Sequence, residues 1–339
     1  MAIITKKSVL KKMLAYRKNM QQGRYALQLV ELNYSNQCNF KCQHCFSKNL
    51  SPSHARMPME AVRELADQAD ALGAWQWHLQ GGEPTIWPEL AQVVEAIDPS
   101  RFHLFITSNG SMLTRDKARM LADIGIDKVS VSIDSFDAGA HDAFRRHDGA
   151  FDKAMAALFH VRDMGMEANI NTCVTALNAQ SEGLMELVRF AEEHNFTMLF
   201  VIAAPVGAWA GRHDLLISEE DAQHLLDLKR RYPFVHRDLY PVLGVEWGCR
   251  TVNGLIYVTP DGDVLSCPFI HIVLGNIHQE PLADILKRGW RVRYFRDYSP
   301  KCLVGEDRDF IEKIIPKYAW AKGAVPFEAA FTDDDLYPE

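Results

Sequence analysis

The stretch CNFKCQHC, residues 38–45, holds three cysteines within eight residues. Cys38, Cys42 and Cys45 are separated by three and then by two residues. A four-iron cluster takes one thiolate per iron, so three thiolates would leave its fourth iron open to a ligand that is not protein. Zinc is the alternative, but its structural sites are closed by four ligands. His44 would strain the loop if it bound the same metal as the cysteines on either side of it.

The composition is that of a soluble globular protein. The chain has 339 residues, of which 47% are apolar and 24% charged, and these values argue against wholesale disorder and a membrane class. No apolar run approaches the ~20 residues of a membrane-spanning helix, and the amino-terminal sequence is not that of a signal peptide. We therefore expect a cytoplasmic protein. Its seven cysteines then favour metal binding or catalysis over disulfides.

Charge is unevenly distributed along the chain. The net charge of -7 gives no reason to expect nucleic acid as a partner. The first 30 residues are nevertheless basic and contain no acid. This segment is either a basic amphipathic helix that contacts a membrane surface or an anionic substrate, or a solvated helix face lying on the domain, and the second interpretation is favoured. The basic residues are Lys6, Lys7, Lys11, Lys12, Arg17, Lys18 and Arg24.

Short β-rich runs alternate with helical patterns through the first two-thirds of the chain. Six β/α units in a row predict parallel strands joined by crossover helices, as an open sheet or a partial (β/α)6 barrel of the TIM type. The expected strands are 27–34, 75–80, 101–107, 127–133, 167–175 and 196–203. The expected helices are 58–72, 88–97, 114–124, 150–164, 181–194 and 218–231.

Unusual residues follow the first four expected strands. The cysteine stretch comes after the first, GGEP (81–84) after the second and TSNG (107–110) after the third, while SIDS (132–135) ends the fourth. Ligands gather at the carboxyl ends of parallel strands in this architecture. These four segments are therefore expected to face one mouth.

The sequence resembles the radical S-adenosylmethionine (radical SAM) superfamily over roughly residues 27–205. The resemblance lies in the combination of C-x3-C-x2-C after strand one with Gly-Gly-Glu-Pro after strand two. The resemblance implies that Cys38, Cys42 and Cys45 hold a [4Fe-4S] cluster whose open iron chelates SAM. Reductive cleavage of SAM would then yield a 5′-deoxyadenosyl radical that takes a hydrogen atom from substrate. It also implies an external reductant such as flavodoxin or ferredoxin.

Other residues of the SAM site follow from the same resemblance. Gly81, Gly82 and Glu83 match the stretch that meets the SAM amino group, and glycine lets a backbone approach a ligand closely. Ser132 and Asp134 sit where similar enzymes meet the SAM ribose or carboxylate, although either residue could simply cap a strand end. Two weaker candidates are Asn109, which could instead belong to a turn, and Arg145.

The pattern changes in the last third of the chain. Pro233, Pro241 and Gly244 interrupt the helical spacing, which predicts a boundary within 232–245. Residues 254–268 read as a β-hairpin around Pro-Asp-Gly-Asp, and a short helix is expected at 281–289. The predicted organisation is a basic helical segment (1–26), a partial barrel (27–235) and a small hairpin-plus-helix domain with a C-terminal tail (236–339).

A second set of cysteines lies in this last part. Cys249, Gly262 and Cys267 resemble the opening of the SPASM and twitch extensions, which hold auxiliary iron–sulfur clusters. A SPASM domain continues with a dense run of cysteines, whereas only Cys302 remains here. The resemblance therefore implies one auxiliary cluster, of the [4Fe-4S] type, on Cys249, Cys267 and Cys302. Glu306 or Asp307 is a guess for its fourth ligand, unless that iron faces substrate. Buried packing is the alternative for these cysteines.

Two further features have open interpretations. Cys173 is either a catalytic hydrogen-atom donor, as in radical SAM epimerases, or a small apolar core residue, which is the commoner case for a lone cysteine. The 13 histidines show no metal-site spacing, and WQWH (75–78) reads as sheet core.

The expected activity is radical SAM oxidation or epimerisation, that is, dehydrogenation or epimerisation of a small natural product such as a sugar, an aminoglycoside-like compound or a nucleoside. A peptide maturase is the alternative within the family, disfavoured because only about 37 residues precede Cys38. An iron–sulfur electron carrier or redox sensor is the alternative from another class, and it would have no use for GGEP or a barrel. A zinc-binding structural protein is a poorer option.

Overall fold

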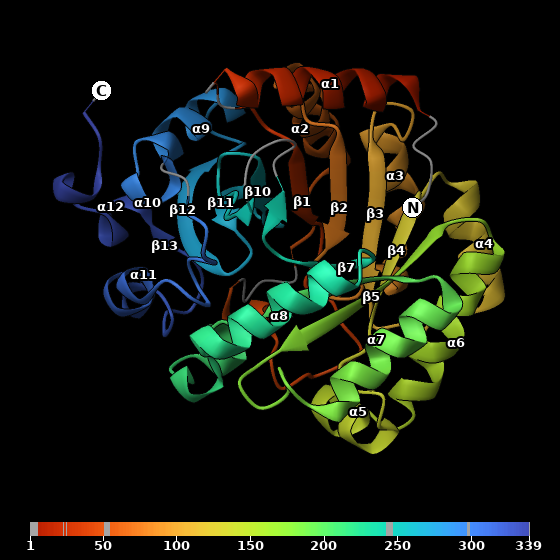
Figure 1. Ribbon diagram of the computed structural model, residues 1–339. Coiled ribbons are helices and arrows are strands. Elements are labelled where there is room, and N and C mark those ends of the chain that lie inside the picture. The colour runs from red at the N-terminus through yellow and green to blue at the C-terminus, as the bar shows by residue number, and fades with distance from the viewer. Residues whose placement is uncertain are drawn as a thin grey trace.

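The computed structural model describes residues 6–22, 24, 26–50, 55–241, 247–296 and 299–338 (Figure 1). The strands are β1 Leu29–Asn33, β2 Gln76–Gln80, β3 His103–Ser108, β4 Lys128–Ser132, β5 Glu167–Val174, β6 Thr197–Ile202, β7 Val235–Arg237, β8 Tyr240–Pro241, β9 Trp247–Gly248, β10 Leu255–Val258, β11 Asp263–Cys267, β12 Ile270–Asn276 and β13 Val325–Pro326. The α-helices are α1 Lys7–Gln21, α2 Met59–Ala71, α3 Leu90–Ile97, α4 Arg115–Asp123, α5 Ala138–Arg145, α6 Ala150–Asp163, α7 Glu182–His194, α8 Glu219–Arg231, α9 Leu282–Trp290, α10 Arg293–Arg296, α11 Arg308–Lys313 and α12 Phe327–Ala330. Short 3-10 helices lie at Phe46–Asn49, Pro84–Ile86, Gly207–Trp209, His213–Leu215, Ile315–Lys317 and Asp333–Asp335.

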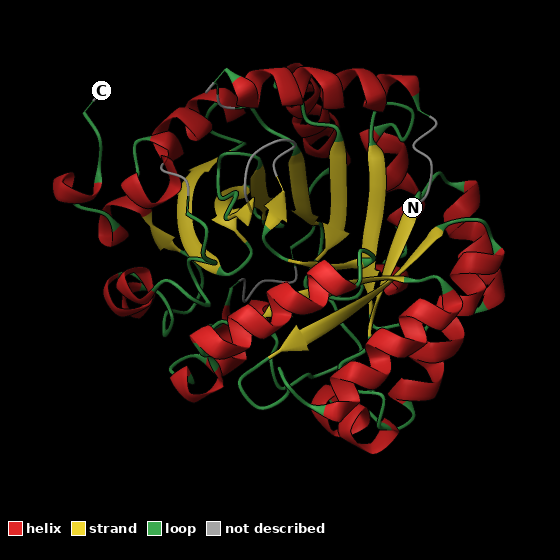
Figure 2. Cartoon of the chain, viewed as in Figure 1, coloured by secondary structure: helices red, strands yellow, loops and turns green. Residues whose placement is uncertain are grey.

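The first six strands form the predicted partial barrel. They are neighbours in sequence order and pair in parallel from β1 to β6, with β7 added in parallel beside β6. Figure 2 shows the strands as a curved sheet with the connecting helices on its outer side. The expected α/β fold is confirmed, and each expected strand agrees with the observed one to within two residues at either end.

The helices bury one apolar face each against the outside of this sheet, as α7 illustrates. Ser181 caps its first turn by accepting a hydrogen bond from the Leu184 amide. Leu184, Leu187, Val188 and Ala191 recur at helical spacing and are all buried. The packing of such faces on the sheet forms one large core that stabilises the barrel.

The carboxyl-terminal part continues the barrel sheet. β10 pairs in parallel with β1, with Leu29 opposite Leu255, and β11, β12 and β13 follow outward to give one 11-stranded sheet. The predicted hairpin is present as β10 and β11, which pair antiparallel, and the third strand β12 was not predicted. The expected boundary at 232–245 lies partly outside the described residues, because 242–246 are not among them.

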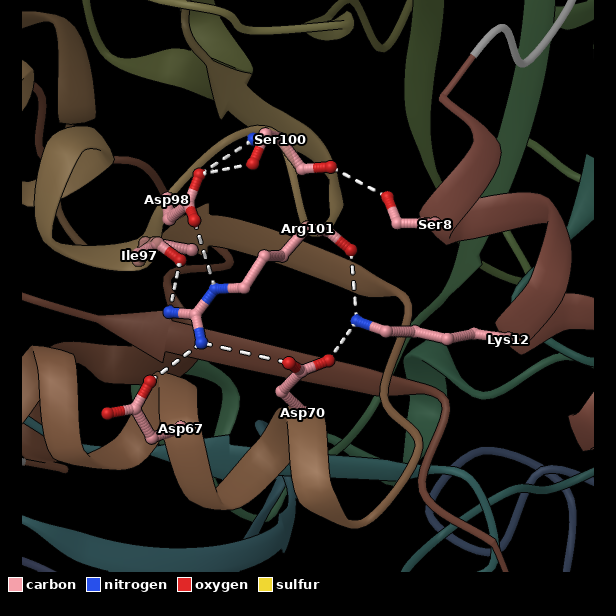
Figure 3. Close-up of polar contacts among 8 residues, drawn as sticks. All are labelled: Ser8, Lys12, Asp67, Asp70, Ile97, Asp98, Ser100 and Arg101. Atoms are coloured by element: carbon pink, nitrogen blue, oxygen red, sulfur yellow. Dashed lines mark hydrogen bonds and ion pairs between the residues drawn. The ribbon is translucent and has the colours of Figure 1, made fainter.

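Helix α1 covers the amino ends of the central strands (Figure 1). Lys12 pairs with Asp70 of α2 and donates to the Arg101 carbonyl at 3.0 Å, and the Ser8 hydroxyl donates to the Ser100 carbonyl at 2.7 Å (Figure 3). Lys6 binds the Asp127 carboxylate ahead of β4 at 2.5 Å. The basic segment is thus a helix lying on the domain, in agreement with the favoured interpretation of its charges.

None of the helices in the described part of the chain is long and apolar enough to cross a membrane.

Candidate active site

A cavity of about 1230 Å³ occupies the inside of the barrel. It extends from Met13 of α1, at the amino ends of the strands, to the cysteine loop after β1. All seven cysteines border it, so the two cysteine sets and Cys173 share one cavity. We call this space the barrel cavity.

Glycines let the cysteine loop pack directly on the GGEP segment. The Gly82 amide donates to the Ser35 carbonyl at 3.0 Å, and the Glu83 amide donates to the Gln37 carbonyl at 2.9 Å. A Cβ on Gly82 would lie 2.0 Å from the Gln37 oxygen. Gly81 has a φ of 135°, a conformation that side chains rarely allow. The two glycines therefore set the position of the chain that leads into Cys38.

Glu83 anchors this segment to the end of β3. Its buried carboxylate accepts hydrogen bonds from the Thr85 amide at 3.1 Å, the Ser108 hydroxyl at 2.7 Å and the Asn109 amide at 2.7 Å. Burial raises the pKa of Glu83, and these donors oppose the shift. The side chain thus joins two strand ends, while Glu83 and the glycines before it border the barrel cavity.

Asn109 also supports the cysteine loop. Its side-chain amide donates to Asn39 Oδ1 at 3.0 Å, and its own Oδ1 accepts from the Ser111 amide at 2.9 Å. The hydrogen bond to Asn39 joins the end of β3 to the stretch between Cys38 and Cys42. The hydrogen bond from the Ser111 amide forms a side-chain turn, which is the alternative role that the sequence allowed for Asn109.

Arg145 and Ser132 border the barrel cavity, whereas Asp134 is not among its lining residues. Arg145 Nε donates to Asp134 Oδ2 at 2.6 Å, and the Cys173 amide donates to Asp134 Oδ1 at 3.0 Å. Burial alone would raise the pKa of Asp134, but the Arg145 guanidinium lowers it below its ordinary value. Asp134 is therefore an ionised partner that holds Arg145 beside Cys42.

The thiols of the cysteine loop suit an iron–sulfur cluster. Burial raises the pKa of the Cys38 thiol to about 12, and burial also raises that of Cys42, where Arg145 opposes it. Thiolates in such surroundings form when a metal replaces the proton. In the described residues, no three His, Cys, Asp or Glu side chains converge on a single-ion site. A four-iron cluster needs no such convergence because each thiolate binds its own iron.

His44 points to aromatic neighbours. Its ring stacks on Phe144 with centroids 4.6 Å apart and lies 5.7 Å from the Trp209 ring. Burial lowers the pKa of His44 to about 3, so the ring is neutral at physiological pH.

The second cysteine set comes from three segments of the carboxyl-terminal part. Cys249 precedes β10, and its amide donates to the Ser299 carbonyl at 2.8 Å. Cys267 ends β11, and Cys302 lies in a buried turn before α11. Gly262 turns the chain between β10 and β11 with a φ of 86°. These positions put all three thiols on the barrel cavity.

Glu306 and Asp307, the guessed fourth ligands of the auxiliary cluster, both hold hydrogen bonds to other groups. Glu306 Oε2 accepts from Arg237 at 2.5 Å and from the Cys302 amide at 2.9 Å. Asp307 Oδ1 accepts from the Phe310 amide at 3.0 Å and so caps α11. Neither carboxylate borders the barrel cavity.

Residues 32–191 match the radical SAM superfamily, and residues 249–304 match an iron–sulfur cluster-binding domain, the SPASM domain. The chain belongs to the radical SAM superfamily. This radical SAM enzyme has a [4Fe-4S] cluster, SAM and an auxiliary iron–sulfur cluster as cofactors. The thiols on the barrel cavity supply donors of the type that both clusters require.

Relatives of this radical SAM enzyme cover most of its length. The AdoMet-dependent heme synthase of Nitratidesulfovibrio vulgaris is 23% identical over 84% of this chain and 86% of its own. The GTP 3′,8-cyclase of Marinobacter nauticus is 25% identical over 76% of this chain and 82% of its own. In fold, Streptococcus suis SuiB bound to its precursor peptide SuiA is similar, with a TM-score of 0.66, 16% identity, and coverage of 95% of this chain and 80% of SuiB.

Sequence reasoning missed a row of polar side chains inside the barrel. The stretch WQWH was read as sheet core, which holds for Trp77, whereas His78 points the opposite way and borders the cavity. Alternation of polar Gln76, His78 and Gln80 with apolar Trp77 and Leu79 is the signal that could have found it. We name this row the polar belt; it has one residue from each barrel strand: Glu31, His78, Thr107, Ser130, Asn171 and Thr197.

Proposed function

We propose that this radical SAM enzyme dehydrogenates a small substrate that carries hydroxyl or amino groups and binds in the barrel cavity between the two cysteine sets. The observation that carries the proposal is the single cavity of about 1230 Å³, bordered by both sets and by the polar belt. TIM-type barrels usually fill their interior with bulky branched side chains. A cavity of this size, with the polar belt among its lining residues, fits a bound ligand instead.

The polar belt is a connected hydrogen-bond network. His78 bonds Glu31 Oε1 at 2.9 Å through Nδ1 and the Thr107 hydroxyl at 2.8 Å through Nε2. The Asn171 amide donates to the same hydroxyl at 3.4 Å. Buried Asn169 then links Asn171, Ser130 and Thr197 at 2.6, 3.2 and 2.8 Å. Such mutual contacts hold the side chains in place before a ligand arrives, which reduces the entropy lost on binding.

Glu31 supports the choice of substrate class. Its second oxygen, Oε2, is buried without a hydrogen-bond partner. A buried carboxylate oxygen is costly to leave unpaired, so a donor from the ligand would be strongly favoured. Lys128 and Glu167, the charged pair further round the barrel, lie 3.5 Å apart and offset each other. An ammonium or hydroxyl group is therefore the complement of Glu31.

When bound, the cofactors supply a 5′-deoxyadenosyl radical and, at the auxiliary cluster, an acceptor for one electron. Dehydrogenation in the barrel cavity would balance if one substrate hydrogen atom passed to SAM-derived 5′-deoxyadenosine, one electron to the auxiliary cluster and one proton to a base of this chain. His78, held by Glu31, is a base of this chain that borders the cavity. Flavodoxin or ferredoxin would supply the electron that cleaves SAM.

Epimerisation is the second reaction considered, because Cys173 borders the barrel cavity. Burial raises the pKa of its thiol, so it stays protonated and able to give a hydrogen atom. If the reaction is epimerisation, the Cys173→Ala variant is expected to cleave SAM but to lose product of inverted configuration. Chiral chromatography of the product checks this. Unchanged inversion in the variant would assign Cys173 to packing against Trp209 and its neighbours.

The relatives favour a small molecule over a peptide. The two named relatives cover most of this chain and carry GTP and heme in their names. SuiB is the support for the alternative, a peptide maturase, because a peptide is bound to a structure whose fold covers 95% of this chain. A peptide segment and a small molecule would both have to reach the barrel cavity, so substrate trials should include both.

The test begins with anaerobically reconstituted protein. Release of 5′-deoxyadenosine with a reductant and SAM is expected, and a matching substrate should lose two mass units. Amino- and hydroxyl-bearing small molecules and short peptides would be supplied in parallel and analysed by mass spectrometry. Fully loaded protein that never cleaves SAM with any of them would instead support an electron carrier or redox sensor.

Glu31→Gln provides a more specific check on the substrate class. This change keeps the shape and the contact with His78 but removes the charge. The KM for an amine-bearing substrate is expected to rise by about 10-fold or more, the loss of one charge-assisted hydrogen bond. Iron content should not change. Glu64→Gln on the exposed side of α2 is the matched control. An unaltered KM in Glu31→Gln would contradict the assignment.

A further inference from the structure

We propose that Asp238 is the fourth protein ligand of the auxiliary cluster, beside Cys249, Cys267 and Cys302. Three thiolates leave one iron of a four-iron cluster without a protein ligand. This fourth iron is either bound by another residue or open to substrate. In the first case the cluster would accept an electron, and in the second it would anchor the substrate. The inference concerns the cofactor and does not depend on which substrate the enzyme takes.

Asp238 has one carboxylate oxygen fixed and one free. Oδ2 accepts a hydrogen bond from the Ile202 amide at the end of β6, at 3.0 Å. The Asp238 amide donates to the Phe200 carbonyl at 3.0 Å, which fixes the backbone just after β7. Oδ1 is buried without a hydrogen-bond partner, and the residue borders the barrel cavity. A buried carboxylate oxygen without a hydrogen-bond partner is energetically costly unless a ligand or a metal binds it.

The turn that carries Cys302 packs on the same strand end. A Cβ on Gly305 would lie 2.8 Å from Ile202 Cγ2, so this turn and Asp238 both contact Ile202. Arg237, the neighbour of Asp238, binds Glu306 at 2.5 Å, and Glu306 in turn accepts from the Cys302 amide. Two independent connections therefore hold Asp238 next to the Cys302 turn.

The other carboxylates near the site are less suited. Glu306 and Asp307 do not border the cavity, and both are held by backbone amides. Glu31 has a free oxygen, but it belongs to the polar belt on β1 and is bound to His78. Among the carboxylates of the described residues, Asp238 combines a free oxygen with a link to the Cys302 turn.

Ligation by Asp238 would close the auxiliary cluster to substrate. The cluster would then accept an electron from the substrate radical and would not anchor the substrate. Reduction potentials of such clusters depend on ligand, charge and hydrogen bonding. Because a thiolate donates more electron density than a carboxylate, Asp238→Cys is expected to lower the midpoint potential of this cluster.

The experiment uses the full chain with Cys38, Cys42 and Cys45 replaced by alanine, so that only the auxiliary cluster remains. Protein would be produced with aspartate labelled with ¹³C at its side-chain carboxylate, and the reduced cluster examined by pulsed electron–nuclear double resonance. A ¹³C coupling is expected in this parent and in the Asp307→Asn control. It should vanish in Asp238→Cys, while iron stays at about four per chain.

Three results would overturn the assignment: no ¹³C coupling in the parent, a coupling that survives in Asp238→Cys, or a parent that holds no iron. Should Asp238→Cys fail to fold, Asp238→Asn keeps the shape of the side chain and serves as the second variant. Altered g-values in Asp238→Asn would support ligation, and a spectrum identical to that of the parent would contradict it.

Discussion

Replacing Cys42 with alanine is expected to abolish the release of 5′-deoxyadenosine from SAM and to lower the iron content from about eight to about four per chain. Cys42 is the middle thiol of the loop after β1 and lies beside Arg145 on the barrel cavity. Without it, one iron of the SAM-binding cluster loses its protein ligand. The auxiliary set would remain intact, because its three cysteines lie on other segments. Iron and sulfide analysis together with chromatography of 5′-deoxyadenosine measure both effects.

Cys173→Ala is the control for iron content. It makes the same chemical change at another cysteine on the same cavity, and about eight irons per chain should remain. If Cys42→Ala also kept its full iron content, the assignment of the loop cysteines to a cluster would be wrong. Loss of all iron would mean instead that the two clusters depend on each other for assembly.

Gly82→Ala is expected to displace the cysteine loop from its position on the GGEP segment. The added methyl would lie 2.0 Å from the Gln37 oxygen, 2.4 Å from the Gln37 carbonyl carbon and 2.7 Å from the Asn36 carbonyl carbon. Backbone must move to relieve these overlaps, since no flexible side chain is involved. Overpacking typically costs ~1–3 kcal/mol in the free energy of unfolding, and we expect a loss at or above that range. The SAM-binding cluster should also fail to load.

Gly139→Ala in α5 is the matched control. Its added methyl would approach only the Asp137 side chain, at an ordinary contact distance of 3.4 Å. Its stability should remain within about 0.5 kcal/mol of the wild type, apart from a small gain in helix propensity. Denaturant titration and iron analysis of both variants make the comparison. Equal midpoints and equal iron would show that the GGEP segment does not determine the position of the loop.

The barrel could be predicted because its signals are local. The strands β1 to β6 are short β-rich runs, several of which alternate polar with apolar residues, and the outer helices repeat apolar residues at the spacing seen in α7. Two of the elements missed, β7 and α5, have weak local signals. β7 has three residues, and α5 has only eight, of which two are buried. Long-range contacts define such short elements, and a sequence pattern does not record those contacts.

The types of residue in the site, and the strand ends that carry them, could be predicted from the sequence. The cysteines, both glycines and Arg145 do gather at one cavity, as expected from motifs that follow consecutive parallel strands. The role of each side chain in the cavity depends on hydrogen-bond partners that are distant in the sequence. The bonds of Glu83 to Ser108 and of Asp134 to Arg145 span 25 and 11 residues, respectively. Likewise, Glu31 lies in an apolar run of sequence, and its hydrogen bond to His78 joins residues 47 positions apart.

Because β10 pairs in parallel with β1, the auxiliary domain covers one open edge of the barrel sheet. A partial barrel has two open edges, and an edge strand with unpaired backbone groups invites pairing with other chains. Here β10 satisfies the free edge of β1, the strand that leads into Cys38. A shortened chain that ends before β10 would expose that edge and lose the part of the cavity lining that comes from Leu255, Cys267, Pro268, Phe269 and Cys302. The region that holds the auxiliary cluster thus also protects the edge strand of the SAM-binding half from pairing with other chains.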